Sequence, residues 1–485
     1  MAKISIITLK YKNLSIPAKA GLWFTICGFI QKGISFITVP IFTRLLTTEQ
    51  YGIVSVYNSW LSLVSIFCTL NLFAGGFNNG MLEYEDRRKQ YLSAIQGLIT
   101  SITCAWFVIY FLSRKFWNSL FEMNTALVVV MFAEVLISSA LSLWSSRERY
   151  EFRYKHLVIV TISNAVFASL FSIVAICLSD SRYAAEAKIV SHALVVFVIC
   201  GIIYIQNLCR GKIFFDKLIW RNALLFNLPL LPHYLSTMVL NQADRIMISK
   251  MVGDSEAGIY SVAYSAAMIL NIIVTSINNS FAPWIYGKLK EKDYNPIKRT
   301  ATSLFAGFSI ILAILISFAP EAIQILAGDK YSEAIIIFPS VATSLYFVFM
   351  YQIFANVEFY FKKNKFVTYA SVTGAILNIF LNYIGISIWG YVAAGYTTLI
   401  CYAVFGIAHY YFMLKVTNKE IPSIILFDGR TVFALGGGLL LFSIVMNVLY
   451  AYTFIRYLIL VLIVIAIIIN RNKIRDIIVM INIKK

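Results

Sequence analysis

Three ionisable side chains interrupt long apolar runs of this sequence, and each is a candidate for chemistry in a low-dielectric environment. Lys32 lies in the run that begins near Trp23, Glu134 lies within "VVVMFAEVLISSAL", and His233 lies within "LPLLPHYLSTMVL". A charged group in the middle of a bilayer-spanning helix costs roughly 2.5–3.5 kcal/mol on insertion, so each needs a reason to be there. A cation can bind an anion, a buried carboxylate can carry a proton, and a histidine titrates near neutral pH.

Each of these residues has two interpretations. Lys32 follows Trp23 by about nine residues, or ~13 Å along a helix. We interpret Lys32 as a cation that lines a wet central cavity, or as the structural partner of a buried acid such as Glu134. Glu134 is either a proton-carrying carboxylate or a structural acid. His233 and His192 either donate to a substrate oxygen or are structural histidines.

Two arginines lie near the ends of apolar runs. We expect Arg44 and Arg245 at the outer mouth of a path, where a guanidinium binds phosphate through two hydrogen bonds. The alternative is that both are interfacial arginines that reach lipid headgroups. Asp244 directly precedes Arg245. Because neighbours at i and i+1 do not face each other on a helix, we expect this pair to have different partners.

Pro229 and Pro232 remove helical hydrogen bonds just before His233. Freed carbonyls are tolerated in a membrane only where protein or water satisfies them, so we expect a bend that faces a cavity and acts as a hinge. A static packing kink is the alternative. Glu358 is expected in a solvated charge cluster at the inner surface, together with Lys362, Lys363 and Lys365.

Sequence motifs for catalysis and cofactors are missing. We find no Walker A motif, no HExxH, no Cys/His cluster and no nucleophile elbow. The seven cysteines lack metal-ligand spacing and are typical of small buried hydrophobic residues. We therefore expect no catalytic residue, no metal and no cofactor. Without a nucleotide motif, we expect net export to draw on a proton or sodium gradient or on consumption of the product outside.

The elements that position these residues follow from the composition. The chain has 485 residues, of which 60% are hydrophobic and 13% are charged, against about 25% charged in soluble domains. A bilayer core of ~30 Å needs about 20 apolar residues per helix. We find about fourteen such runs, and strands with period-2 patterning are missing, so the predicted fold is all-α. The runs lie near residues 21–42, 52–74, 91–112, 124–144, 157–178, 184–206, 223–247, 258–281, 301–319, 334–357, 366–386, 389–412, 431–449 and 454–470.

The net charge of +18 has a topological explanation. If the N-terminus is cytoplasmic, 31 of the 41 Lys and Arg residues fall in cytoplasmic segments, including a basic tail at 471–485. This alternation is the positive-inside rule. We therefore expect a multi-pass membrane protein with both termini in the cytoplasm. The charge indicates contact with membrane lipids and gives no reason to expect nucleic acid.

A weak internal repeat divides the chain. "EQYGIVSVYNSW" (49–60) resembles "EAGIYSVAYSAA" (256–267), "ERYEFRYKHL" (148–157) resembles "EFYFKKNKFV" (358–367), and "YAAEA" (183–187) resembles "VAAGY" (392–396), all at offsets near 210. An offset of six helices keeps orientation, so the repeat is parallel. We expect two six-helix bundles at 1–210 and 211–415 around a central cavity. Two further helices and the tail follow at 416–485.

Three stretches resemble a known family. "LNIFLNYIGISIWGYVAAGYTTLICY" (377–402), "PIFTRLLTTEQYGIVSVY" (40–57) and "ADRIMISKMVGDSEAGIYSVAY" (243–264) are similar to motifs of the polysaccharide-transporter branch of the multidrug/oligosaccharidyl-lipid/polysaccharide flippase superfamily. The resemblance covers about 20–460. The positions matched by motif are Arg44, Gly52, Asp244, Arg245, Gly258, Tyr260, Asn378, Asn382 and Gly390.

The resemblance implies a flippase for lipopolysaccharide O-antigen, capsule or exopolysaccharide biosynthesis. Such a protein moves an undecaprenyl-diphosphate-linked oligosaccharide to the outer leaflet by alternating access through a cationic cavity. A polysaccharide polymerase and a chain-length regulator are expected partners. One alternative is an ion-coupled multidrug exporter of the same fold. A second is a membrane enzyme of polysaccharide assembly, a polymerase or glycosyltransferase, although the chain lacks the long external loop that such an enzyme needs.

Overall fold

A computed structural model describes residues 15–422 and 424–469 of the chain. Over these residues every regular element is a helix, which confirms the all-α prediction. Thirteen helical segments are long and apolar enough to cross a bilayer, and α20 (Thr453–Ile469) is a shorter apolar helix. The expectation of about fourteen transmembrane helices is therefore confirmed. The predicted basic tail at 471–485 and Lys3, Lys10 and Lys12 lie outside the described residues.

The chain folds into two compact units, Met1–Met238 and Val239–Lys485. The helices of unit 1 are α2 (Ile16–Leu45), α3 (Thr48–Thr69), α4 (Phe77–Glu83), α5 (Arg88–Leu112), α6 (Arg114–Phe121), α7 (Thr125–Tyr150), α8 (Tyr154–Leu178), α9 (Ala184–Gly211) and α10 (Lys217–Asn227). The chain passes into unit 2 inside α11 (Leu231–Met251). The later helices are α12 (Asp254–Met268), α13 (Asn271–Glu291), α14 (Asn295–Ser317), α15 (Ala319–Ala327), α16 (Ala334–Tyr360), α17 (Asn364–Trp389), α18 (Ala393–Glu420), α19 (Gly429–Leu449) and α20.

The two compact units divide the chain later than the repeat does. The helix α10 follows residue 210, yet it packs on α5 within unit 1, where the Trp220 indole Nε1 donates to the carbonyl of Ala94 at 2.8 Å. Ile219, also on α10, is buried in the same core as Leu92 and Ile95. The boundary of the sequence repeat, at residue 210, therefore differs from the boundary of the packed units, at residue 238. The two bundles at 1–210 and 211–415, and the separate segment at 416–485, stay predictions.

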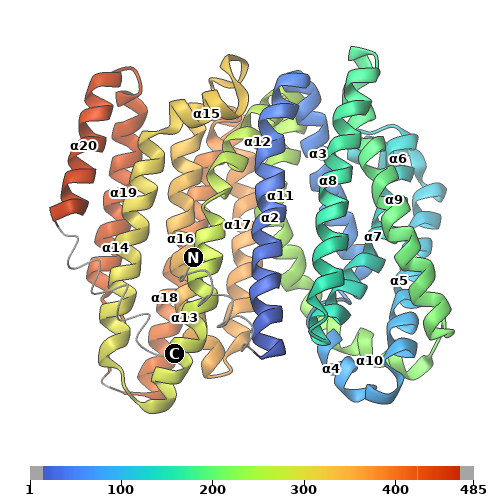
Figure 1. Ribbon diagram of the computed structural model, residues 1–485. Coiled ribbons are helices and arrows are strands. Elements are labelled where there is room, and N and C mark those ends of the chain that lie inside the picture. Colours follow the sequence, from blue (N-terminus) through green and yellow to red (C-terminus); the bar gives the residue numbers. More distant parts are fainter. Residues whose placement is uncertain (1–14, 423, 470–485) are drawn as a thin grey trace, which may run out of the picture. The chain divides into compact units, whose positions relative to one another are not determined.

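Helix α2 crosses the full height of unit 1 and exposes most of its length (Figure 1). Ser15 caps its N-terminus, and Pro17 stands in the first turn, where the missing N–H is harmless. Its buried residues are Ala20, Cys27, Phe42 and Thr43. Helix α3 follows at once, and a reciprocal capping box between Thr47 and Gln50 fixes its start.

Helix α16 is the centre of unit 2 and is apolar on every side, which is typical of a helix enclosed by others. It packs against α12, α14, α18 and α19. Its rings join a larger aromatic core, in which Phe349 lies 5.1 Å from Phe305 and 5.0 Å from Phe308 of α14. Helices α12 and α18, which pack directly on α16, carry polar residues of the site in unit 2 that is described below.

The predicted break at the prolines is visible as a local change of helix type. A 3-10 turn over Leu228–Leu230 contains Pro229 and separates α10 from α11. Pro232 stands in the first turn of α11. Thus the backbone tightens just before His233, as the missing N–H groups require. Whether this point acts as a hinge stays a prediction.

Candidate functional site

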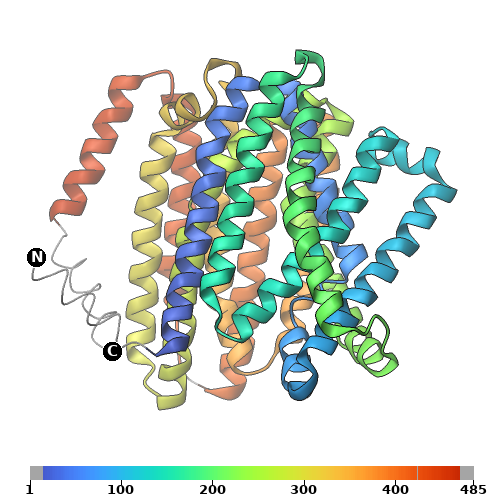
Figure 2. The same ribbon diagram turned by 45° about the vertical axis from the view of Figure 1, so that its right-hand side comes forward.

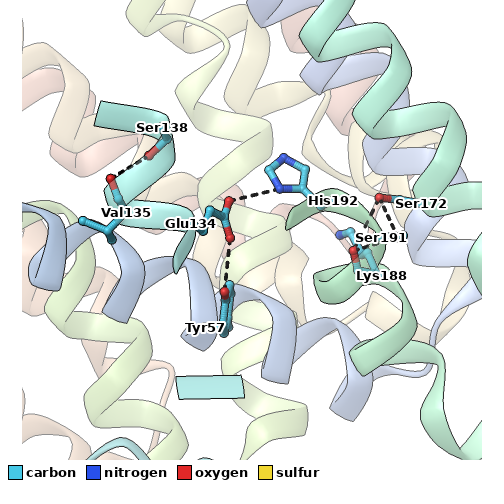
Figure 3. Close-up of polar contacts among 8 residues, drawn as sticks. All are labelled: Tyr57, Glu134, Val135, Ser138, Ser172, Lys188, Ser191 and His192. Atoms are coloured by element: carbon cyan, nitrogen blue, oxygen red, sulfur yellow. Dashed lines mark hydrogen bonds and ion pairs between the residues drawn. The ribbon is translucent and has the colours of Figure 1, made fainter. Parts of the chain in front are cut away.

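Unit 1 holds a buried carboxylate between three helices (Figure 3). Glu134 of α7 is 4% exposed. The hydroxyl of Tyr57, on α3, donates to its Oε2 at 3.1 Å, and the Nδ1 of His192, on α9, lies 3.2 Å from its Oε1. The His192 side chain is 46% exposed, so it joins the buried acid to the surface of the unit. We name Tyr57, Glu134 and His192 the Glu134 cluster.

This arrangement can hold and pass a proton. A carboxylate and an imidazole in contact share the task of binding one proton, and the half-exposed ring gives that proton a way in and out. Lys32 is not part of the cluster. It is exposed on α2, and no hydrogen bond or ion pair joins it to another described residue. The interpretation of Lys32 as the structural partner of Glu134 is therefore wrong, because His192 occupies that place.

A second cation of unit 1 lies one helical turn before His192. The Nζ of Lys188 stands over the ring of Phe42 at 3.9 Å and over the ring of Tyr51 at 5.4 Å. Ser191 and Ser172 donate to the Lys188 carbonyl, and Figure 3 shows these contacts beside the Glu134 cluster. Aromatic faces stabilise an ammonium without neutralising it. The Nζ of Lys188 on α9 is thus enclosed by rings of α2 and α3.

Unit 2 holds a buried carboxylate with four donors. Asp244 of α11 is 1% exposed. Its Oδ2 accepts from the hydroxyls of Tyr260 at 2.6 Å and Thr398 at 2.7 Å. Its Oδ1 accepts from the amide of Asn382 at 2.5 Å and from that of Asn378 at 3.3 Å. We name Asp244, Tyr260, Asn378, Asn382 and Thr398 the Asp244 cluster. It joins α11, α12, α17 and α18.

The Asp244 cluster contains oxygen atoms of the kind that hard cations bind, although both amides turn their nitrogens toward the carboxylate. One carboxylate, two amide oxygens and two hydroxyls lie within one small buried volume, and oxygen is the ligand that Na⁺, Mg²⁺ and Ca²⁺ share. The Oδ1 of Asn378 is buried and has no hydrogen-bond partner. A half-turn of that amide would place this oxygen, in place of the Nδ2, against Asp244. Among the described residues no group of three or more His, Cys, Asp or Glu side chains could hold a metal ion.

The neighbouring arginine has partners of its own, as its spacing predicts. The guanidinium of Arg245 donates to the carbonyl of Asn241 at 2.8 Å and to the Gln242 side chain at 3.0 Å. It also stacks on the Tyr264 ring, 4.3 Å from the centroid. Arg245 is 8% exposed. Arg245 is thus enclosed in unit 2. Arg44, on α2 of unit 1, is exposed, and its guanidinium donates to the carbonyl of Pro40.

The prediction for Glu358 is wrong. Glu358 is fully buried near the end of α16, and its Oε1 lies 2.8 Å from the Nδ1 of His409 on α18. The second oxygen of Glu358 and the Nε2 of His409 are both buried without a hydrogen-bond partner. Proximity in sequence to three lysines suggested a solvated cluster, but the helix turns this side chain toward α18. His233, for its part, is half-buried next to Tyr234.

Four of the residues matched by motif meet in one place. Asp244, Tyr260, Asn378 and Asn382 come from two separate stretches of the sequence and together make most of the Asp244 cluster. Sequence reasoning missed Lys188, His409 and the pairing of His192 with Glu134. The first two carried a signal, since each is an ionisable residue inside an apolar run. Nothing in the sequence marks Tyr57 or Thr398.

Two solved structures of transporters have the same fold. The lipid II flippase MurJ in its inward closed conformation aligns with a TM-score of 0.68 at 15% identity, over 93% of this chain and 100% of that one. A multidrug resistance MATE family transporter, inward-facing, aligns with a TM-score of 0.61 at 12% identity, over 81% and 96%. At these identities the likeness is one of fold.

Sequence comparisons identify the family. A Haemophilus influenzae protein described as a product of the Lsg locus is 25% identical over 374 residues, which are 72% of this chain and 86% of that protein. The MatE model matches residues 229–384. The model described as "Polysaccharide biosynthesis protein" matches residues 18–287, more than half of the chain. Because that match covers more than half of its length, this chain belongs to the polysaccharide biosynthesis protein family.

Proposed function

We propose that this protein flips an undecaprenyl-diphosphate-linked oligosaccharide from the cytoplasmic to the outer leaflet of the bacterial inner membrane by alternating access. The repeat unit would serve O-antigen, capsule or exopolysaccharide biosynthesis, with a polymerase and a chain-length regulator as downstream partners. The family match and the Lsg-locus relative support a role in polysaccharide assembly. The fold shared with a lipid II flippase supports transport over catalysis. Both termini are proposed to lie in the cytoplasm.

The proposal rests chiefly on a difference in exposure between the buried acids and Lys32. Glu134, Asp244 and Glu358 are each buried and hydrogen-bonded inside one unit. None of these acids presents its charge to a ligand. Lys32 is exposed near the middle of α2, roughly 20 Å from either end of that helix. A mid-membrane cation that stays exposed favours an anionic substrate, and a diphosphate is a strong anion.

The same contrast ranks the alternatives. An exporter of cationic drugs of this fold needs acidic side chains that face the drug, and the three deep acids are satisfied by protein groups. A polymerase or glycosyltransferase needs a catalytic loop, and the described loops between the membrane helices are short. Arg44, exposed on α2, adds a second cation for the diphosphate. The glycan is hydrophilic and wide, so it needs a wide path with polar groups.

Energy coupling is part of the proposal. The Glu134 cluster is the candidate proton site, because His192 connects its buried acid to the surface of unit 1. A diphosphate bound near unit 1 would draw a proton onto the cluster by electrostatic attraction, and the linkage is reciprocal. The Asp244 cluster is the candidate site for a sodium ion. Proton coupling through Glu134 is the first proposal and sodium coupling through Asp244 is the alternative.

The test in cells uses two substitutions of one residue. Lys32→Ala removes the exposed cation and Lys32→Arg keeps it. In a strain that depends on this chain for its surface polysaccharide, we expect Lys32→Ala to abolish the polymer at unchanged protein level, and Lys32→Arg to restore part of it. Lys292→Ala, a loop cation at the end of α13, is the matched control and should have no effect. Normal polymer from the Lys32→Ala strain would contradict the proposal.

A further inference from the structure

An aromatic cavity lies inside unit 1, apart from both clusters. It has a volume of about 220 Å³ and lies between α3, α5, α6 and α7. Its lining includes three tryptophans and three phenylalanines: Trp60, Trp106, Trp117, Phe67, Phe121 and Phe132. The volume is several times the roughly 30 Å³ that one water occupies in the liquid, and a site lined only by apolar groups is expected to stay dry. Such a cavity suits an apolar chain.

The helix α6 closes one side of the cavity and is amphipathic. The Phe121 ring packs edge-on against Trp60 at 4.8 Å between centroids and stacks with Trp117 at 5.6 Å. Tyr110 of α5 donates to the Asn118 side chain at 2.9 Å, which ties α6 to the preceding helix. In Figure 2, the short helix α6 connects the ends of α5 and α7. The expected topology places this end of unit 1 at the membrane interface on the external side. The position is typical of an interfacial helix.

Arg114 is the first residue of α6 and lies on the same helix face as the residues that line the cavity. Arg114 precedes Trp117 by three residues and Phe121 by seven, so helical periodicity places all three on one face. Arg114 is exposed, and no hydrogen bond or ion pair joins it to another described residue. Lys115 points about 100° away from Arg114 around the helix axis, on the same face as Ser119. By the expected topology external segments hold few Lys and Arg residues, which makes this cation unusual.

One residue of the lining has a donor without a partner. The indole Nε1 of Trp117 is buried and has no hydrogen-bond partner. Trp117 lies one turn from Arg114 on the same face. A donor and a guanidinium in this order, next to an apolar cavity, match a ligand with an anionic oxygen group at one end and an apolar chain at the other. The exposed arginine also disfavours a lipophilic cation, which the rings alone would accept.

We propose that this cavity and Arg114 bind a polyprenyl phosphate lipid at the outer end of unit 1, with the chain among the rings and the phosphate on the guanidinium. The choice of a polyprenyl lipid over other lipid phosphates rests on the proposed function, since that lipid must reach the outer leaflet. A methyl-branched chain also makes more contacts in a wide cavity than a straight acyl chain does. The site would receive the lipid at the end of its passage.

The test is a cross-linking experiment on the full-length protein. A polyprenyl phosphate with a diazirine in its chain is placed in nanodiscs of phosphatidylcholine that hold the protein, and labelled peptides are identified after illumination. We expect label in 60–68 and 117–121. Unlabelled polyprenyl phosphate should compete for the site. Polyprenol, which lacks the phosphate, and phosphatidylglycerol, which lacks the isoprenoid chain, should compete at least about tenfold less well.

Two variants and a control make the site specific. Arg114→Ala should weaken labelling of both segments about tenfold, since a charge-assisted hydrogen bond is lost. Leu63→Trp, which fills the cavity from α3, should weaken it to a similar degree. Lys115→Ala removes the same charge one residue along and should leave labelling within twofold. Equal competition by phosphatidylglycerol, or equal loss in Lys115→Ala and Arg114→Ala, would overturn the proposal.

The binding assay separates this site from the proposed function. Because it measures labelling and not transport, a wild-type protein that binds the probe as expected but moves no lipid-linked oligosaccharide would contradict the proposed function and leave this site standing. A protein that transports normally but labels elsewhere would contradict the site alone.

Discussion

Removing the carboxylate of Asp244 should measurably lower the free energy of unfolding of unit 2. Asp244→Ala leaves the donors of Tyr260, Asn378, Asn382 and Thr398 without their acceptor in a buried volume. Side-chain hydrogen bonds between membrane helices contribute about 0.6 to 1.7 kcal/mol each, so four give roughly 2 to 7 kcal/mol. The two hydroxyls can turn toward other acceptors, which places the expected loss in the lower half of that range.

Asp244→Asn is the informative comparison. The asparagine keeps one oxygen for the amides of Asn378 and Asn382, and its new Nδ2 faces two hydroxyl oxygens that can accept. We therefore expect a loss of only about 1 kcal/mol. Asp329→Ala, an exposed acid in a loop of unit 2, is the control and should stay within about 0.5 kcal/mol of wild type.

The assay is unfolding of the purified protein in detergent, followed by tryptophan fluorescence in increasing denaturant. The predicted order of stability is wild type and Asp329→Ala, then Asp244→Asn, then Asp244→Ala. If Asp244→Ala is as stable as wild type, the four contacts do not hold α11, α12, α17 and α18 together. If Asp244→Asn is as damaging as Asp244→Ala, charge and not hydrogen bonding is the stabilising element.

Three further predictions concern coupling, topology and pH. In liposomes with an imposed pH gradient, Glu134→Gln should still transport substrate downhill but should not respond to the gradient. Full pH dependence of transport in that variant would make Glu134 merely structural. If wild type responds only to a sodium gradient, Asp244→Asn should abolish that response. Reporter fusions after Lys155 and Lys365 should be cytoplasmic and one near Asp329 external, and a cytoplasmic signal at Asp329 would contradict the topology. Burial alone would raise the pKa of Glu321, but hydrogen bonds from Arg456 and Tyr457 lower it below the usual 4.5. This contact therefore stabilises the docking of α20 above pH 4.5 and is lost as the pH falls through the lowered pKa. The protection of the α20 amides against hydrogen exchange, corrected for the intrinsic pH dependence of exchange, should therefore fall in acid and already be low in Glu321→Gln.

The membrane helices were predictable because their signal is local. An apolar run of about 20 residues is visible in any window, and the charges that flank it follow from the same physics. Glu134 and Asp244 could be singled out for the same reason, since a charge in such a run is conspicuous. The family resemblance named Tyr260, Asn378 and Asn382, although no local pattern explained them. Their common reason, one buried carboxylate, appears only in three dimensions.

The partners of the buried charges could not be predicted, because they come from other helices. Glu358 and His409 are 51 residues apart, and Glu134 lies 77 residues from Tyr57. Helix rotation decides which neighbour a side chain meets, and an apolar helix with little amphipathic character does not reveal its rotation. For that reason the sequence suggests adjacent lysines as the neighbours of Glu358, whereas the structure pairs it with His409. The sequence likewise suggests Lys32 as a partner of Glu134, whereas the structure places His192 there. The aromatic cavity was equally invisible, since aromatic residues are common throughout the chain.

The most direct measurement is flipping by the purified protein in liposomes. An undecaprenyl-diphosphate-linked oligosaccharide is incorporated in both leaflets, and an added glycosidase that cannot cross the membrane cuts the glycans it can reach. Wild type should make nearly all of the glycan accessible, Lys32→Arg should do so more slowly, and Lys32→Ala should leave the inner half protected over the same time. If wild type leaves the inner half protected but expels a lipophilic cation from the same liposomes, the chain is a drug exporter and the account given for Lys32 is wrong.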